Sequence, residues 1–499
     1  MPSFFSRHSW LLAALALALL VASGRLAIIA HYGSDLPYED QWAAETNAFV
    51  IPLGEGNFGP AKLFLPTNEH RICFTLFTNA ALFVLSGQWD ARQQMVVNAL
   101  LYAALFAGVW YSLARPQGRW WPALTFLLVA AAGGLPVVSE NEMCGFQSQF
   151  FFVSGFSLYC LFRLLGSPVG SWQWHTGWLA GICAMLSLGS GFLAPLVVLV
   201  VIFAQIIFGG FESFRRCRAT LIAASLLLAF GWLVHARAPA ETQALHAGNA
   251  RQFFTYLLAG LAWPATDLFW LGFVVYTPGL WLAWLWCRRI SWRDRRSTYI
   301  GAGIFWVLLQ AAGLAYSRSN TTMWPPANRY GDLYLYGLIF NAAAVILLLE
   351  RPELRRQRWG IAALLLALLS IFGIGATRAT RHALTEWLPK QRTAFRSHEK
   401  TIAAYLVTHD AGELDRGTYP YPVRSVMVFM LDNPAIRPHL PASVLGESRN
   451  NSGGRRASLL SCAASGVSRA WPIIAGLGAI FALLAIGHCL RSIVLCRIA

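Results

Sequence analysis

The chain of 499 residues contains few charged side chains. Only 12% of its residues are Asp, Glu, Lys or Arg, against roughly 25% in an average soluble domain, while 56% are hydrophobic. Apolar runs of about 20 residues, the length that crosses a bilayer, recur along the chain. This composition excludes an ordinary soluble domain and predicts an all-α polytopic membrane protein.

Acidic residues are the scarcer charge: 23 Asp and Glu stand against 39 Lys and Arg, a formal net charge of +16. In a soluble protein this excess would suggest a nucleic-acid partner. Here the arginines gather in short segments between apolar runs, a pattern that reports orientation in the membrane. No basic stripe is free of the membrane, so we expect no nucleic-acid partner.

Two further absences narrow the class of protein. The nine cysteines show neither a CxxC motif nor a regular spacing, so the sequence does not support a disulfide framework. No internal repeat is visible, which argues against a transporter built from duplicated halves.

The first apolar run extends from Trp10 to Ala30 and follows Arg7 and His8. The letters "VASG" around Ala22 offer a weak cleavage site for a secretory signal peptide. Because the run continues to spanning length, an uncleaved signal anchor is the favoured interpretation. A bacterial inner membrane is the simplest location.

The basic clusters predict a topology. If "RICFTLFTNAALFVLSGQ" (71–88) lies on the membrane surface as an amphipathic helix, the second span runs from about Gln93 to Leu113. Every later basic cluster then lies on one side, which is cytoplasmic by the excess of arginine. This predicts about 12 spans with both termini cytoplasmic. The clusters are Arg115 with Arg119, Arg215–Arg218, Arg288–Arg296, Arg351–Arg358, and Arg491 with Arg497.

Two apolar regions contain interruptions. The stretch "FFTYLLAGLAWPATD" is broken by Pro264 and Asp267, so it is predicted to be a surface or re-entrant helix. The stretch "SLGSGFLAP" divides an apolar region into two spans at Gly189, Gly191 and Pro195.

The resulting domain organisation has three parts. Residues 1–376 form a transmembrane module, whose first external loop covers 31–92. Residues 377–470 form an external segment of mixed charge, which is marginal in size for an independent domain and is expected to be a small helical cap. Residues 471–499 form the last transmembrane helix and a cytoplasmic tail. Residues 447–458 have the composition of a flexible linker.

Three segments predicted to be external are rich in side chains that commonly act in catalysis or binding. The first loop contains "DLPYEDQW" and ends with "PTNEHRI"; the second segment is "SENEMCGFQSQFF" and the third is "PPANRYGDLY". All three lie on the outer face in the predicted topology.

These segments resemble those of the GT-C superfamily of integral-membrane glycosyltransferases. The closer likeness is to a group of bacterial multi-pass proteins with DQW, NEHRI, ENxxxGFQxQFF and RY motifs. The motifs stand here as Asp40-Gln41-Trp42, Asn68–Ile72, Glu140–Phe151 and Arg329-Tyr330. The likeness extends to about Arg378 and is weak beyond it. Each motif alone is unspecific; the four in order on one face are moderately specific.

The resemblance implies a GT-C-like bundle that moves a sugar from a polyprenyl-phosphate donor to an acceptor at the outer, periplasmic face, with inversion. The acceptor is a glycan, a lipid or a protein. A first-loop carboxylate, Asp40 or its neighbour Glu39, acts as general base on the acceptor hydroxyl. Cationic groups stabilise the departing phosphate. The implied substrate-binding residues are Trp42, His70, Arg71, Glu140, Asn141, Gln147, Arg329 and Tyr330.

Structural roles compete with these assignments. Asp40 could solvate a loop or pair with Arg71, Glu140 could cap the helix that follows it, and Arg329 could snorkel at the membrane edge. No cofactor is required by the sequence. A divalent cation held by oxygens of Glu39, Asp40 and Glu140 stays open, since no ligand spacing demands it.

Two other functions use similar features. A transporter or flippase of a lipid-linked sugar would place ionisable groups inside the helices, whereas the acids here lie in external loops and the spans are nearly free of charge. An enzyme similar to O-antigen ligases or polymerases would use a lipid-linked sugar on the same face, with its main loop late in the chain.

Overall fold

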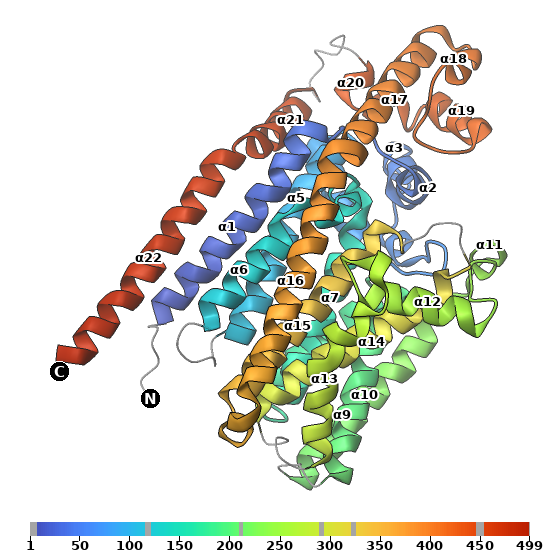
Figure 1. Ribbon diagram of the computed structural model, residues 1–499. Coiled ribbons are helices and arrows are strands. Elements are labelled where there is room, and N and C mark those ends of the chain that lie inside the picture. Colours follow the sequence, from blue (N-terminus) through green and yellow to red (C-terminus); the bar gives the residue numbers. More distant parts are fainter. Residues whose placement is uncertain are drawn as a thin grey trace.

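The computed structural model describes residues 7–114, 121–208, 213–288, 294–320, 326–445 and 454–498. Within these ranges the chain is helical and forms no β-strand; a single isolated bridge joins Thr67 and His70. Most of the long helices run side by side in one bundle (Figure 1). The prediction of an all-helical membrane protein is therefore confirmed at this level.

Nine helical segments of the described ranges are long and apolar enough to cross a membrane, or up to ten if the bent pair α21–α22 counts as one span. The bent pair comprises α21 (Gly454–Arg469) and α22 (Trp471–Ile498). The helices within the nine segments are α1 (Arg7–Tyr32), α5 (Ala91–Ala114), α6 (Trp121–Gly134), α7 (Ser148–Gly166), α9 (Leu193–Ile207), α10 (Phe214–Val234), α14 (Arg295–Arg318), α15 (Gly331–Glu350), and α16 (Arg358–His382) with α17 (Leu388–Thr408).

The difference from the predicted count of about 12 lies in short helices. Helix α8 (Trp172–Met185) has 14 residues and α13 (Leu271–Cys287) has 17. At 1.5 Å per residue these helices reach roughly 21 and 26 Å, less than a hydrocarbon core of about 30 Å. The stretch predicted to lie on the surface forms α4 (Cys73–Ser86), also of 14 residues, which ends at Gly87 with a φ of 70°.

The predicted interruptions are visible as breaks between helices. Met185 ends α8, and α9 begins at Leu193 after a short turn. Helix α12 (Ala250–Leu261) has 12 residues and lies across the direction of the bundle in Figure 1. The remaining short elements are α11 (Ala240–Gln243), η3 (Pro136–Val138), η4 (Glu140–Glu142), η5 (Gly145–Gln147), η6 (Gly189–Phe192), η7 (Thr266–Leu268), η8 (Asn328–Tyr330) and η9 (Pro352–Gln357).

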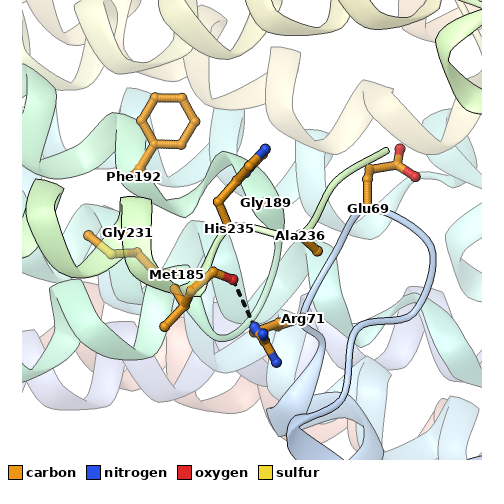
Figure 2. Close-up of a pocket in the computed structure, with 9 residues that line it drawn as sticks. Glu69, Arg71, Met185, Gly189, Phe192, Gly231, His235 and Ala236 are labelled. Atoms are coloured by element: carbon orange, nitrogen blue, oxygen red, sulfur yellow. Dashed lines mark hydrogen bonds between the residues drawn. The ribbon is translucent and has the colours of Figure 1, made fainter. Parts of the chain in front are cut away.

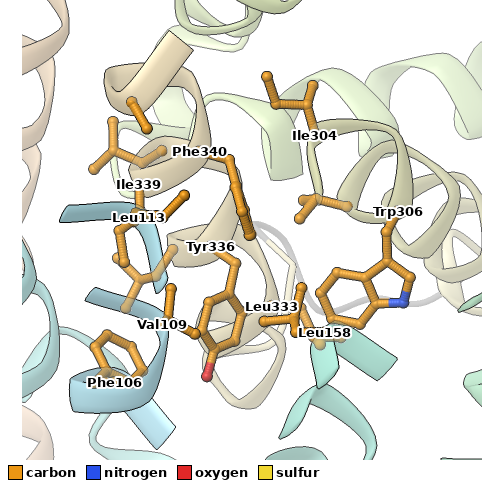
Figure 3. Packing of buried hydrophobic residues seen from close by; sticks show 14 of the residues in the cluster. Phe106, Val109, Leu113, Leu158, Ile304, Trp306, Leu333, Tyr336, Ile339 and Phe340 are labelled. Atoms are coloured by element: carbon orange, nitrogen blue, oxygen red, sulfur yellow. The ribbon is translucent and has the colours of Figure 1, made fainter. Parts of the chain in front are cut away.

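Helix α15 forms the centre of the bundle, and 94% of the residues in its most apolar stretch are buried. Its aromatic side chains fill the space between neighbouring helices: the Tyr336 ring lies 5.3 Å from the Phe106 ring of α5 and 6.3 Å from the Trp306 ring of α14 (Figure 3). Small residues bring α1 and α6 together, because a Cβ at Gly24 would lie 2.1 Å from the carbonyl oxygen of Gly134. Such close contacts favour glycine at helix interfaces in membranes.

The bundle has two different ends. One end holds the start of α1, the end of α22 and the links α9–α10, α13–α14 and α15–α16 (Figure 1). Two ion pairs join the start of α14 to the end of α15: Arg296 lies 2.5 Å from Glu350, and Arg351 lies 3.6 Å from Asp294. We call this the arginine-rich end. The predicted cluster at Arg115 and Arg119 lies outside the described residues.

The opposite end, which we call the cap end, holds the first loop and the C-terminal segment (Figure 1). Helix α16 does not stop at residue 376: it continues through a π-helical turn into α17, so residues 352–408 form one helical run of 57 residues. The other elements here are α2 (Asp40–Glu45), η1 (Thr46–Val50), α3 (Ile51–Gly54), η2 (Pro60–Phe64), η10 (Ala383–Trp387), α18 (Gly412–Asp415), α19 (Arg424–Asp432), η11 (Arg437–His439) and α20 (Ala442–Leu445).

The first loop and the C-terminal segment share one apolar core. Trp42, Phe49 and Trp89 are fully buried in it together with Tyr405 and Met427. The C-terminal segment is helical within the described residues and has no separate core of its own. The linker predicted at 447–458 lies largely outside the described residues.

A buried carboxylate, Glu45, fastens the first loop to the bundle. It accepts hydrogen bonds from Trp89 Nε1 at 2.5 Å, Asn79 Nδ2 at 2.6 Å and Gln94 Nε2 at 3.1 Å. Burial raises the pKa of Glu45, against the effect of these donors. The donors come from α4, α5 and the link between them, so the position of α2 at the cap end is fixed by polar contacts as well as apolar packing.

Candidate functional site

Two of the predicted motifs meet at an ion pair between η4 and η8. Arg329 Nη1 lies 3.2 Å from Glu140 Oε1, and the Arg329 backbone N–H donates to Glu140 Oε2 at 3.1 Å. The Glu140 N–H in turn donates to Asn328 Oδ1 at 3.2 Å. The side chains of Arg329 and Glu140 keep 31% and 28% of their surface exposed, so a ligand can reach the pair. Segments 188 residues apart are thus joined by reciprocal contacts.

Glu39 of the first loop is near enough to this pair for its charge to be felt there. Its charge acts on both Arg329 and Glu140. Burial raises the pKa of Glu140, the Arg329 guanidinium opposes this, and the charge of Glu39 adds to the rise. Burial and Glu39 together also raise the pKa of Tyr38. Residues of the three segments that the sequence analysis singled out therefore lie near one another at the cap end.

The backbone of Glu39 is unusual. Its φ of 50° and ψ of −128° lie in a region that residues with a Cβ rarely adopt, and its N–H donates to the Pro420 carbonyl at 2.8 Å. Such conformations occur where surrounding structure holds them, often at functional sites. The next residue, Asp40, begins α2 and is exposed.

Tyr330 extends the site toward the end of the first loop. The Arg329 guanidinium lies 5.6 Å from its ring centroid, and Arg318, the last residue of α14, is close enough to interact electrostatically with its side chain. Arg318 forms an ion pair with Glu69, and Glu69 Oε1 lies 3.3 Å from His70 Nε2. Burial works to raise the pKa of Glu69, but the neighbouring cations outweigh it and lower that pKa. These groups extend the site from the Glu140–Arg329 pair toward His70.

His70 itself is partly enclosed. Burial lowers its pKa, and Nδ1 has no hydrogen-bond partner among the described residues. The imidazole is therefore neutral near neutral pH and can accept a proton or a hydrogen bond.

The side chain of Arg71 is held by hydrogen bonds to two backbone carbonyls. Its Nε donates to the Val234 carbonyl at 2.8 Å, and its Nη1 donates to the Phe64 carbonyl. Figure 2 shows the small pocket beside it, which His235 and Gly189 also line. The cavity of about 20 Å³ has room for a water molecule and is far too small for a sugar. Arg71 forms no ion pair with Asp40 in the described structure.

A buried charged cluster lies beneath the ion pair. Arg25 of α1 contacts Asp332 of α15 at 3.3 Å and Glu142 of η4 at 3.7 Å, and its guanidinium lies 3.2 Å from the Tyr102 ring centroid. Asn141 Nδ2 donates to Asp332 Oδ2 at 2.8 Å and to the Arg329 carbonyl at 2.7 Å. The expectation that the spans are nearly free of charge is wrong here, since Arg25 and Asp332 both lie within apolar helices.

Three of the predicted substrate-binding residues are inside the protein. Asn141 holds the cluster and the Arg329 backbone together. Gln147 is buried and accepts from Gln149 Nε2 at 3.4 Å. Trp42 is 0% exposed, donates from Nε1 to the Pro37 carbonyl at 2.7 Å and packs edge-on against Trp89. In this conformation Trp42 is a core residue, and a sugar has no access to its ring.

Sequence reasoning missed Arg318 and Glu69 as members of the site. Glu69 stands inside the quoted NEHRI motif, and Arg318 ends a helix on the predicted outer face, so both were within reach of a search for paired charges. A metal site finds no support, because no group of three or more His, Cys, Asp or Glu side chains among the described residues could hold an ion.

The described arrangement combines exposed carboxylates, a neutral imidazole and two guanidinium groups where apolar helices end. It can remove a proton from one group and stabilise negative charge on another. Comparison of the chain with known protein families, with curated proteins and with solved structures finds no match.

Proposed function

We propose that this protein is a membrane glycosyltransferase that moves a sugar from a polyprenyl-phosphate donor to an acceptor at the outer face. The observation that carries this proposal is the partly exposed Glu140–Arg329 ion pair, on which the charge of Glu39 acts. A base and a cation close together at the end of apolar helices suit a donor whose phosphate sits at the membrane surface. The resemblance of the four motifs to GT-C enzymes supports the same function.

Each group has a part in the proposed reaction. Glu39 takes the proton of the acceptor hydroxyl as its oxygen attacks the anomeric carbon, and the bond from that carbon to the phosphate oxygen breaks with inversion. Arg329 and Arg318 stabilise the charge on the departing phosphate. Tyr330, which interacts electrostatically with both guanidinium groups, holds them in position. Planar guanidinium groups suit phosphate because they donate along two parallel bonds.

The proposal includes the topology. About 12 spans, with α8 and α13 crossing as short helices, place both termini in the cytoplasm and the cap end in the periplasm of a bacterial inner membrane. The arginine-rich end then obeys the excess of positive charge on the cytoplasmic side.

The decisive experiment is a transfer assay in membranes that contain the protein, with a panel of polyprenyl-phosphate and polyprenyl-diphosphate sugars. We expect transfer from a monophosphate donor. Glu39→Gln should lower the rate by about 10²–10⁴-fold, the usual contribution of a general base. Glu55→Gln, an exposed acid of the same loop, is the matched control and should retain activity. No transfer by the wild-type protein from any donor would refute the proposal.

Transfer from the diphosphate donors alone would indicate the alternative enzyme, one similar to O-antigen ligases or polymerases.

A transporter of a lipid-linked sugar is the second candidate, and the buried Arg25–Asp332 pair favours it, since ionisable groups inside a membrane often mark a transport path. The position of the pair weakens this interpretation. Arg25 lies seven residues before the end of α1 and Asp332 is the second residue of α15, so both are within roughly 10 Å of the helix ends. Uptake of a labelled lipid-linked sugar into vesicles, without covalent transfer, would establish the transporter.

A further inference from the structure

A lateral groove at the arginine-rich end has no part in the proposed reaction. Thr277, Leu280, Trp281 and Trp284 of α13 line it together with two residues of η9, Leu354 and Gln357. Its volume is about 470 Å³, within the range of sites that hold small molecules. Leu354 is buried, whereas Leu280 and Trp284 keep 62% and 50% of their surface exposed. The groove is therefore open to the side and almost entirely apolar.

Positive charge surrounds this apolar groove. Arg288 directly follows α13, and its guanidinium lies 5.4 Å from the Trp284 ring centroid. Arg355, Arg356 and Arg358 are next to the lining residues of η9, and all three are exposed. None of these four arginines forms an ion pair within the described part of the chain. Arg351, by contrast, is paired with Asp294.

The apolar groove and the arginines around it together indicate the chemical class of the ligand. Exposed leucine and tryptophan on the side of an apolar helix would contact acyl chains, because lipid is the solvent of such a face. Unpaired guanidinium groups at its end would contact phosphate, and basic pockets between helices on the cytoplasmic side bind anionic lipids. A water-soluble anion would leave the apolar wall unused, and a protein segment would have no counterpart for four like charges.

We propose that the groove binds one anionic phospholipid of the leaflet at the arginine-rich end. An acyl chain lies along Leu280, Trp281 and Trp284, while the headgroup phosphate contacts Arg288 and the arginines of η9. This site is distinct from the candidate catalytic site at the cap end, and it does not depend on the proposed transferase activity.

The test measures lipid retained by the full-length protein purified in detergent and its thermal stabilisation by phosphatidylglycerol relative to phosphatidylcholine. We expect the wild-type protein to retain phosphatidylglycerol and to be stabilised by it. Two variants address the two halves of the site. Replacing Arg288, Arg355, Arg356 and Arg358 by glutamine should lower the retained phosphatidylglycerol by at least about fivefold, from a contribution of about a factor of five per arginine. Leu280→Trp, which keeps every charge and fills the groove, should lower it as well.

The matched control is Arg215→Gln with Arg218→Gln, two exposed arginines at the same end of the bundle but on α10. This control should retain phosphatidylglycerol. Equal losses in the control and the fourfold variant would overturn the proposal in favour of unspecific attraction to the surface. Unchanged retention in Leu280→Trp would overturn it too.

Inorganic phosphate, titrated into the wild-type protein, separates the two sources of anion without any variant. Stabilisation by phosphate equal to that by phosphatidylglycerol would show that the apolar groove is not used, and would also overturn the proposal.

Discussion

Glu39 combines an accessible carboxylate with a backbone conformation that suits glycine. A glycine at this position would adopt φ 50° and ψ −128° without the cost that a Cβ brings, of order 1–3 kcal/mol. The presence of glutamate is therefore explained by its side chain rather than by its backbone. Asp40, one residue later, has ordinary helical surroundings at the start of α2.

This contrast yields a prediction that separates function from stability. Glu39→Gly should raise the free energy of unfolding by about 1 kcal/mol or more by relieving the backbone, yet abolish transfer. Asp40→Asn should lower transfer by less than about tenfold, because a solvated acid near the base acts only through its field. Thermal unfolding and transfer assays on the same preparations would check both. Full activity in Glu39→Gly, or loss in Asp40→Asn alone, would return the catalytic role to Asp40.

Arg329 offers a second test at this scale. Arg329→Lys keeps the positive charge but loses the planar fork that bonds Glu140 and a phosphate together. We expect kcat/KM to fall by about 10²-fold, comparable to the loss of one donor to a developing negative charge. Arg416→Lys, an exposed residue of the cap that is paired with Glu413, should have no effect. An active Arg329→Lys variant would indicate that Arg329 only snorkels to the membrane surface.

Among the elements, those predicted best from sequence have a strong apolar period and clear ends. The bounds of α1 and α5 lie close to the predicted spans, and α4 is short because Arg71 and Gly87 limit its apolar run. The boundary at residue 376 was harder to predict, because hydropathy falls there while helix-forming residues continue into α17. The hydropathy of a segment indicates whether lipid or water surrounds a helix, but it does not indicate where the helix ends.

The candidate site was predictable only in part, because the sequence indicates the topology of the chain but not the directions of its side chains. Topology alone brought Glu140 and Arg329 to one face, and the structure pairs them. The side-chain directions were out of reach: Trp42 points into the shared core, and Arg71 points toward Val234. Those directions depend on packing between segments hundreds of residues apart, which one sequence does not contain.

The connection of α1, η4 and α15 through Arg25 gives a prediction about pH. One guanidinium faces two buried acids, Asp332 and Glu142, and burial raises the pKa of Glu142 to about 8, against the effect of Arg25. Glu142 is therefore protonated in the folded protein at neutral pH but ionised in the unfolded chain, whose value is near 4.5. Stability should accordingly be highest at low pH within this window and fall as the pH rises from about 5 to about 8.

Thermal unfolding in detergent across this range would measure the effect. The Glu142→Gln variant should show a shallower decline and a higher unfolding temperature than the wild-type protein near pH 8, because its amide cannot ionise. The Arg25–Asp332 contact is unchanged in this variant, so a difference between the two pH profiles reports the ionisation of Glu142. Identical pH profiles for the two proteins would contradict the assignment.

At the scale of the whole molecule, the candidate site and the four arginines around the groove, which form no ion pair in the described structure, lie at opposite ends of one bundle. The candidate site and the C-terminal segment lie at the cap end, and the anionic-lipid groove lies at the arginine-rich end (Figure 1). Under the proposed function and topology, a donor held by the membrane would reach the cap end by diffusing in the outer leaflet.

Labelling of single cysteines would establish which end faces outward. In a cysteine-free background, Ala61→Cys of η2 and Glu353→Cys of η9 introduce exposed thiols at the cap end and the arginine-rich end. An impermeant maleimide added to intact cells with a permeabilised outer membrane should label Ala61→Cys only. Lysed cells should give label at both positions. Label at Glu353→Cys in intact cells would invert the topology and place the candidate site in the cytoplasm.

The core shared by the first loop and the C-terminal segment cannot be completed until the C-terminal segment has been synthesised. Trp42 leaves the ribosome roughly 360 residues before its core partner Tyr405, an interval of roughly 20–70 s at ordinary rates of synthesis. Throughout that interval the part of this core that the first loop supplies lacks its C-terminal partners, although Trp42 can already pack on Trp89. Every nascent chain therefore passes through a period in which this loop is open to proteases and chaperones, and truncation before residue 405 makes that period permanent.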